Sequence, residues 1–74
     1  MNVFIIGGTS GIGYALADFY HLQGNRVGVC GRDLEKLTTE SRFEKFQADV
    51  IDKELLTHTI RQFVGTDTLS LLIN

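Results

Sequence analysis

Hydrophobic positions along the chain follow two kinds of pattern. Residues 3–6 form a continuous apolar run, which is typical of a parallel strand covered on both faces. Further apolar runs occupy 26–30 and 69–73, and a weaker one lies within 43–50. The pattern therefore predicts four strands, of which the first and the last are buried.

Between these runs, apolar residues recur at three- and four-residue spacing, which indicates helices with one buried face. The segment from Gly11 to Gly24 predicts a helix of about three turns, with Gly24 where a left-handed cap is wanted. A brief helical segment is predicted over 34–39. A further helix is predicted from Asp52, whose side chain can cap it, to a stop at Gly65.

Strands that alternate with helices predict right-handed crossovers and a parallel sheet of the α/β class. The expected architecture is a Rossmann-type sheet with the strand order 3-2-1-4 and helices on both faces. No repeat or proline-rich linker interrupts the 74 residues, so we expect residues 1–74 to belong to a single domain. A chain of this length buries only a modest core, and its stability alone should be marginal.

The composition excludes several classes of partner. Seven basic and nine acidic residues give a net charge of -2, so nucleic acid and anionic membranes are not expected partners. Cys30 is the only cysteine, which excludes an internal disulfide, fits a reducing compartment and favours the cytoplasm. Neither Cys30 nor the histidines His21 and His58 have metal-ligand or catalytic spacing. We expect a core position for the cysteine and exposed helix positions for both histidines.

A glycine-rich turn, GGTSGIG at 7–13, joins the first predicted strand to the first predicted helix. Backbone N–H groups and the helix dipole at such a turn favour a phosphate group. Gly8 and Gly13 have the GxxxxG spacing of a nucleoside triphosphate loop, but Tyr14 and Ala15 stand where lysine and serine or threonine are needed. The GxGxxG fingerprint is also absent, because a leucine stands where its third glycine would be.

The spacing that remains is GxxxGxG, carried by Gly7, Gly11 and Gly13. Inside a strand–helix–strand unit it resembles the TGxxxGIG motif of the short-chain dehydrogenase/reductase family, with Ile6 in place of the usual threonine. Asp49-Val50, after the third predicted strand, resembles the family's Asp-Val pair at the adenine pocket. Leu72-Ile73-Asn74 resembles the opening of its Asn-Asn-Ala-Gly segment. The resemblance covers the whole chain.

This resemblance implies a nicotinamide dinucleotide cofactor held by the glycine turn. Gly7 would permit the tight turn, Gly11 the close approach of the diphosphate, and Gly13 the packing of the helix on the strand. The hydroxyl groups of Thr9 and Ser10 would either reach a phosphate or cap the helix.

Four further positions have an implied role, and three of them also have a structural alternative. Ile12 would make apolar contact at the loop or pack in the core. Asp49 would accept from the adenine amino group and the Val50 N–H would donate to a ring nitrogen, unless Asp49 is only a turn residue. Asn74 would lie beside the cofactor's ribose or would simply fray.

The choice of cofactor depends on the end of the second strand. In the family's register the discriminating position is Gly31, and Arg32 follows it. A guanidinium there can bind a 2′-phosphate, which favours NADP(H). Asp33 lies about twenty residues past the loop and could instead bind the ribose hydroxyls, which would imply NAD(H). In a third alternative Arg32 is a solvated charge and Asp33 is a helix cap.

The resemblance also implies an oxidoreductase that interconverts an alcohol and a carbonyl compound. The family's YxxxK pair and its substrate pocket lie beyond these residues, so no catalytic residue is assigned. We expect the N-terminal cofactor-binding part of a longer enzyme, incomplete relative to the family fold and inactive alone, with a small-molecule substrate and a homo-oligomeric state. The alternative is a dinucleotide-binding module without chemistry, or a truncated product. Alone, the 74 residues should self-associate through the open edge of the last strand.

Overall fold

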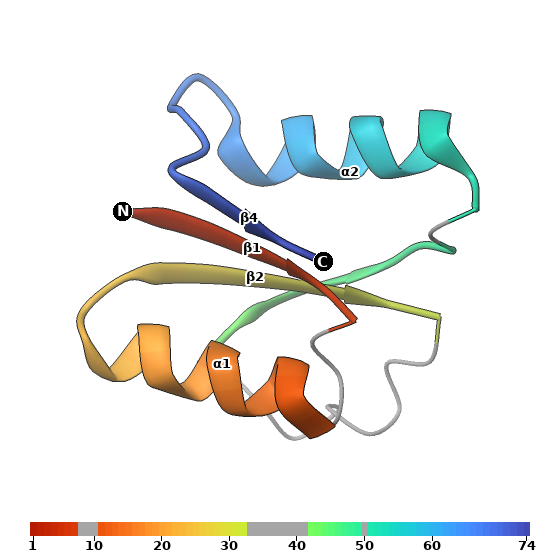
Figure 1. The fold of residues 1–74 in the computed structure, drawn as a ribbon. Coiled ribbons are helices and arrows are strands. Elements are labelled where there is room, and N and C mark those ends of the chain that lie inside the picture. Colours follow the sequence, from red (N-terminus) through yellow and green to blue (C-terminus); the bar gives the residue numbers. More distant parts are fainter. Residues whose placement is uncertain (8–10, 33–41, 50) are drawn as a thin grey trace.

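A four-stranded parallel sheet forms the centre of the molecule (Figure 1). The structure is a computed structural model that describes residues 1–7, 11–32, 42–49 and 51–74. The strands are β1 (Asn2–Ile6), β2 (Arg26–Gly31), β3 (Glu44–Gln47) and β4 (Leu71–Ile73). Their order is β3-β2-β1-β4, which confirms the predicted sheet and places β1 between β2 and β4.

Two helices, α1 (Gly11–Leu22) and α2 (Lys53–Val64), cover opposite faces of this sheet (Figure 1). Because successive side chains of a strand point to opposite faces, β1 supplies both cores. Val3 and Ile5 pack in the core on the α1 side, and Phe4 packs with Phe63 of α2 on the other. All three β1 side chains are fully buried, as the continuous apolar run predicts.

The end of α1 is set by a glycine in the left-handed region. Gly24 has a φ of 87°, and its N–H donates to the His21 carbonyl at 2.9 Å. The Asn25 N–H donates to the Tyr20 carbonyl at 3.2 Å. These two bonds satisfy carbonyls that the last helical turn leaves free, so the predicted cap is confirmed.

The helix α2 begins and ends at the residues that the sequence predicts. Asp52 caps it, because the Leu55 N–H donates to Asp52 Oδ1 at 3.0 Å. Gly65, with a φ of 60°, ends it by donating its N–H to the Arg61 carbonyl at 2.8 Å. The helical segment predicted over 34–39 lies outside the described residues.

The last strand is shorter and less buried than the sequence predicts. A buried strand was expected over 69–73, but β4 covers only Leu71–Ile73, and Leu72 is 47% exposed. Among the described residues β4 pairs only with β1, so it is an edge strand whose faces are incompletely covered. The hydrophobic run therefore indicated the strand correctly but overestimated its length and burial.

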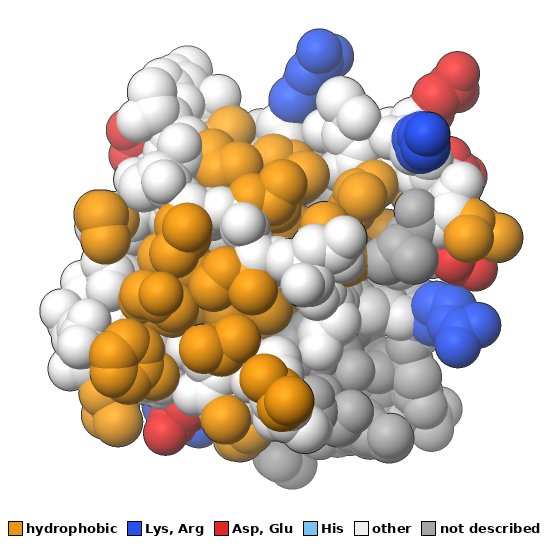
Figure 2. Space-filling view, viewed as in Figure 1, with side chains coloured by type: hydrophobic (Ala, Val, Ile, Leu, Met, Phe, Trp, Pro, Cys, Tyr) orange, Lys and Arg blue, Asp and Glu red, His pale blue; other side chains and the backbone are white. Residues whose placement is uncertain are grey.

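A hydrophobic surface continues from this edge. Phe19 and Leu22 of α1 are 51% and 74% exposed. Figure 2 shows hydrophobic side chains gathered over the side of the molecule on which α1 and β4 lie. A strand edge next to exposed apolar surface is a template for pairing with another chain.

We expect a 74-residue polypeptide of this sequence to self-associate for that reason. Sedimentation velocity should show a mass that rises with concentration. Leu72→Lys, which places a charge on the edge strand, should shift the distribution toward monomer. A compact monomer at high concentration that melts cooperatively would contradict this expectation.

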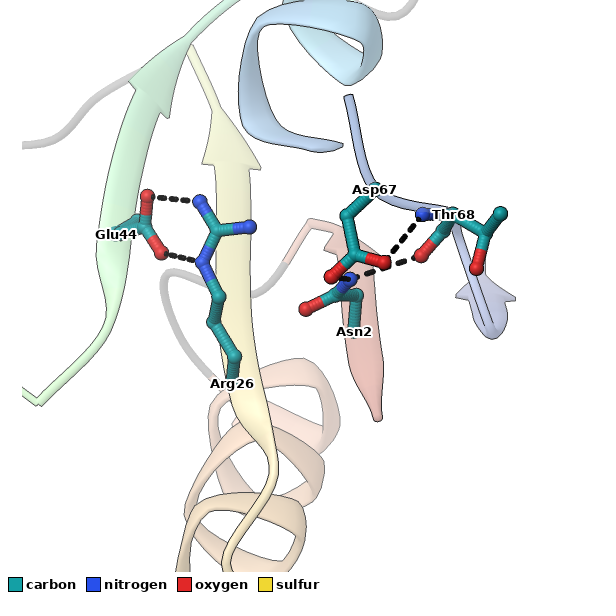
Figure 3. A network of polar contacts seen from close by, with 5 residues as sticks. All are labelled: Asn2, Arg26, Glu44, Asp67 and Thr68. Carbon is teal, nitrogen blue, oxygen red and sulfur yellow. Dashed lines mark hydrogen bonds and ion pairs between the residues drawn. The ribbon is translucent and has the colours of Figure 1, made fainter. Parts of the chain in front are cut away.

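A polar network fastens the start of β1 to the segment between α2 and β4 (Figure 3). The buried side chain of Asn2 donates to Asp67 Oδ2 and to the Thr68 carbonyl, both at 2.9 Å. Hydrogen bonds from the Asn2 side chain and the Thr68 N–H lower the pKa of Asp67. Because the pKa of Asp67 is lower in the folded state, its carboxylate stabilises the fold at pH values above the unfolded-state pKa, about 3.9. This stabilisation is lost as the pH falls through the folded-state pKa.

Gly28, in the middle of β2, leaves room for an aromatic cluster that the sequence analysis missed. It lies opposite Phe4 in the sheet, and a Cβ atom built on it would lie 2.8 Å from the Phe63 ring and 2.9 Å from the Phe4 ring. The ring centroids of Phe4 and Phe63 are 5.3 Å apart, and Phe46 lies 6.0 Å from Phe63. Phe63 thus occupies the space that a side chain at position 28 would need.

Candidate functional site

The turn after β1 is attached to the neighbouring strand before it leaves the sheet. The Gly7 N–H donates to the Cys30 carbonyl of β2 at 2.7 Å, so this donor is already used. Gly7 has a φ of 82°, a conformation that side-chain-bearing residues rarely adopt. The backbone conformation at position 7 therefore favours glycine, and the role of Gly7 in binding a cofactor stays a prediction.

The helix α1 begins at a glycine with a positive φ. Its first residue, Gly11, has a φ of 61°, and a Cβ atom built on Gly7 or Gly11 meets no described atom within 4 Å. The first N–H groups of a helix have no partner within the helix and carry the positive end of its dipole. Gly13, half-buried, belongs to this first turn. The arrangement can therefore receive an anionic group.

Of the three other predicted site residues in the glycine turn, the structure describes Ile12. Ile12 is 82% exposed, so the prediction that it packs in the core is wrong: its side chain lies outside the helix face that contacts the sheet. Thr9 and Ser10 lie outside the described residues. Their two alternative roles, phosphate contact and helix cap, stay predictions.

Arg32 follows the end of β2, at the same edge of the sheet as the glycine turn. The residue is exposed, and its carbonyl accepts a hydrogen bond from Gln47 Nε2 of β3 at 3.0 Å. Asp33, the competing residue for a ribose contact, lies outside the described residues. A guanidinium at this place is a permanent positive charge beside an edge that can receive an anion.

Asp49 follows β3 and shapes the turn into α2. Its Oδ1 atom accepts from the Ile51 N–H at 3.2 Å, and its carbonyl accepts from the Asp52 N–H at 3.0 Å. The half-buried Asp49 is thus a turn residue, and a contact with adenine stays a prediction. Val50 lies outside the described residues.

Asn74 follows β4 and is exposed. Because Ile73 pairs with Ile5 in register, Asn74 leaves the sheet at the edge where β1 also ends. The carboxyl ends of parallel strands meet at one edge, and open α/β sheets bind their ligands there. One edge of the sheet therefore carries four predicted site residues, each of which follows a different strand: Gly7, Arg32, Asp49 and Asn74.

The cysteine and the two histidines have no described position that indicates catalysis or metal binding. Cys30 is fully buried, burial raises the pKa of its thiol, and its Sγ lies 3.6 Å from the Ala48 carbonyl. His58 is exposed as predicted, but the prediction for His21 is wrong, because His21 is half-buried with its ring edge-on to Phe43 at 5.9 Å. Sequence spacing alone did not reveal that this face of α1 meets the segment before β3.

Neither a metal cluster nor a membrane-spanning helix occurs in the described part of the chain. It holds no group of three or more His, Cys, Asp or Glu residues that could bind a metal ion. It also holds no helix of the length and hydrophobicity that crossing a membrane requires. A shallow hollow of about 350 Å³ lies on α2, lined by Lys53, Glu54, Thr57, His58 and Arg61. Its lining comes from one helix, so it is a gap between neighbouring side chains of α2.

Solved structures resemble this chain over nearly its whole length. A short-chain dehydrogenase from Bacillus anthracis is 29% identical with a TM-score of 0.86, and the match covers 99% of this chain and 33% of that chain. A protein described as a short-chain dehydrogenase/reductase family protein is 25% identical with a TM-score of 0.84, over 100% of this chain and 32% of that one. MalC reductase/Diels-Alderase from Malbranchea aurantiaca, at 24% identity and a TM-score of 0.83 over 96% of this chain and 34% of that one, shows the fold alone.

No protein-family model matches the chain. No curated protein matches it either. The chain spans about a third of the length of the solved structures named above. The resemblance inferred from the sequence is confirmed: the chain is short-chain dehydrogenase/reductase-like, with part of the Rossmann-like α/β fold of these oxidoreductase neighbours.

Proposed function

We propose that the edge formed by the ends of β1 and β2 binds a nicotinamide dinucleotide, with its diphosphate on the first turn of α1. The observation that carries this proposal is the start of α1 at Gly11, after the strand β1: Gly11 has a positive φ, and a Cβ atom built on it would meet no described atom within 4 Å. N–H groups of this first helical turn would donate to the diphosphate. The dipole alone contributes typically 0.3–1 kcal/mol, so hydrogen bonds supply most of the affinity.

The proposed cofactor is NADP(H) rather than NAD(H). Arg32 is exposed at the end of β2, and Gly31, the last residue of that strand, has no side chain to occupy the space beside it. A guanidinium can bind a phosphate through two parallel hydrogen bonds, whereas an acidic residue at this strand end would repel the 2′-phosphate. These two features support NADP(H) without requiring any contribution from Asp33.

The proposed reaction is the interconversion of an alcohol and a carbonyl compound, with hydride supplied or accepted by the bound cofactor. Residues 1–74 are the N-terminal part of the cofactor-binding domain in this proposal. Their task is to bind and orient the dinucleotide, and we assign the proton transfer and the substrate pocket to the remainder of a longer protein. Two similar structures are described as short-chain dehydrogenases or reductases, which supports the reaction class, and this chain matches only about a third of each, which supports the division.

Arg32→Ala tests the choice of cofactor. Loss of hydrogen bonds to a charged phosphate, about 1.5–3 kcal/mol, should weaken NADPH binding about 10- to 100-fold. NADH, which lacks that phosphate, should lose far less. Fluorescence titration of the full-length protein with both cofactors measures the two affinities.

Arg32→Lys provides the control for charge, because lysine keeps the positive charge without the planar fork. Its affinity for NADPH should fall between those of the wild type and Arg32→Ala. Equal losses for both cofactors in Arg32→Ala would remove the basis of the NADP(H) assignment. Absence of binding by either cofactor to the folded wild-type protein would overturn the dinucleotide site itself.

A further inference from the structure

Two hydrogen bonds join the ends of β2 and β3 beside Arg32, the residue proposed to bind the 2′-phosphate. Gln47, the last residue of β3, lies opposite Gly31 in the parallel ladder. The Ala48 N–H donates to the Gly31 carbonyl at 3.1 Å. The Gln47 side chain then donates through Nε2 to the carbonyl of the next residue, Arg32, at 3.0 Å.

These bonds fix the direction in which the chain leaves the sheet at Arg32. Successive carbonyls of an extended strand point toward opposite edges, so a single neighbouring strand normally bonds only alternate ones. Here the carbonyls of Gly31 and Arg32 both accept from the β3 segment, and the chain bends at Arg32. The Gln47 amide therefore holds the peptide group that follows Arg32 after the regular ladder has ended.

We infer that Gln47 is a positioning residue for coenzyme selectivity, acting through the Arg32 backbone. This inference rests on the proposed function, in which the Arg32 guanidinium binds the 2′-phosphate of NADP(H). An arginine side chain loses much rotamer freedom when it binds, and a fixed backbone confines the space that its guanidinium searches. The neutral Gln47 amide adds no charge of its own, so its effect is on geometry.

Gln47→Leu removes the donor and keeps a side chain of similar length. Affinity for NADPH should fall about threefold to tenfold, the equivalent of one such hydrogen bond, while affinity for NADH changes by less than about twofold. Titration of the full-length protein with both cofactors gives the selectivity ratio. In an Arg32→Ala background, Gln47→Leu should leave that ratio unchanged, because the side chain that it positions is gone.

Glu44→Leu is the matched control, since it removes another side-chain contact between β3 and β2 at the opposite end of the strand pair. Glu44 accepts from Nε and Nη2 of Arg26, with Nη2 at 2.6 Å (Figure 3). This variant should leave the NADPH-to-NADH ratio unchanged even where thermal melting shows a loss of stability. A ratio that changes as much as in Gln47→Leu would mean that any weakening of the β2–β3 pair has this effect.

Three further results would overturn the role of Gln47. They are equal losses for both cofactors, no loss for either, and a loss of selectivity that persists in the Arg32→Ala background. A normal Arg32→Ala response together with an unaffected Gln47→Leu ratio would reject the positioning role and leave the proposed function standing. An unaffected ratio in Arg32→Ala itself would reject both the positioning role and the NADP(H) assignment, and would leave the dinucleotide site standing.

Discussion

Gly28→Ala should destabilise the folded protein by about 1–3 kcal/mol, the cost typical of overpacking a core. The new methyl group would lie 2.8 Å from the Phe63 ring and 2.9 Å from the Phe4 ring, closer than carbon atoms approach without displacement. Neither ring can retreat freely, because both belong to the buried cluster between the sheet and α2. The restriction of the unfolded chain by alanine acts in the opposite direction but contributes only about 0.5–1 kcal/mol.

Urea unfolding followed by circular dichroism would measure this change as a lower midpoint. Phe63→Leu supplies the matched background, since it removes the ring atoms nearest to position 28. Gly28→Ala should cost much less in that background than in the wild type, because the two side chains compete for one space. Equal costs in both backgrounds would show that the contact with the Phe63 ring is not the cause.

Gly11→Ala should weaken the binding of NADPH and NADH alike, by about a hundredfold. The residue has a φ of 61°, and the space beside it is where the diphosphate would approach. A side chain there keeps the phosphate away from the N–H groups, and each lost hydrogen bond to a charged group costs about 1.5–3 kcal/mol. The left-handed backbone adds about 1–2 kcal/mol of strain to the folded state.

Gly24→Ala separates the two effects. Gly24 also has a positive φ, 87°, and a Cβ atom built on it would meet no described atom within 4 Å, but it lies at the other end of α1. It should therefore lower stability to a similar extent and leave cofactor affinity unchanged. Isothermal titration calorimetry on the full-length protein would compare them. Wild-type affinity in Gly11→Ala would reject the proposed diphosphate site.

The features that the sequence predicted well are those set by local interactions. Glycine at positions 24 and 65 relieves a steric restriction within its own turn, and Asp52 bonds an N–H three residues away. The burial of β1 follows from a hydrophobic run that has no polar face to expose. The strand order is the one expected of a doubly wound parallel sheet, an expectation that needs no side-chain detail.

What the sequence did not reveal depends on residues that meet only after folding. Gly28 and Phe63 are distant in the chain, so the glycine gave no sign that it accommodates a ring. The bond from Gln47 to the Arg32 carbonyl likewise depends on the register of β2 against β3. His21 is half-buried for the same kind of reason, because Phe43 reaches it from the segment before β3.

The bond from the Gly7 N–H to the Cys30 carbonyl has a consequence for the design of cofactor preference. It ties the entrance of the glycine turn to β2, and β2 is also the strand from which Arg32 departs. The proposed contacts with the diphosphate and with the 2′-phosphate of the adenosine ribose thus both depend on the position of β2. A substitution that shifts β2 would displace both contacts together. It would lower the affinity for the cofactor as well as the selectivity between NADP(H) and NAD(H). Substitutions that exchange one coenzyme for the other are therefore best made after Gly31, because they leave the position of β2 unchanged.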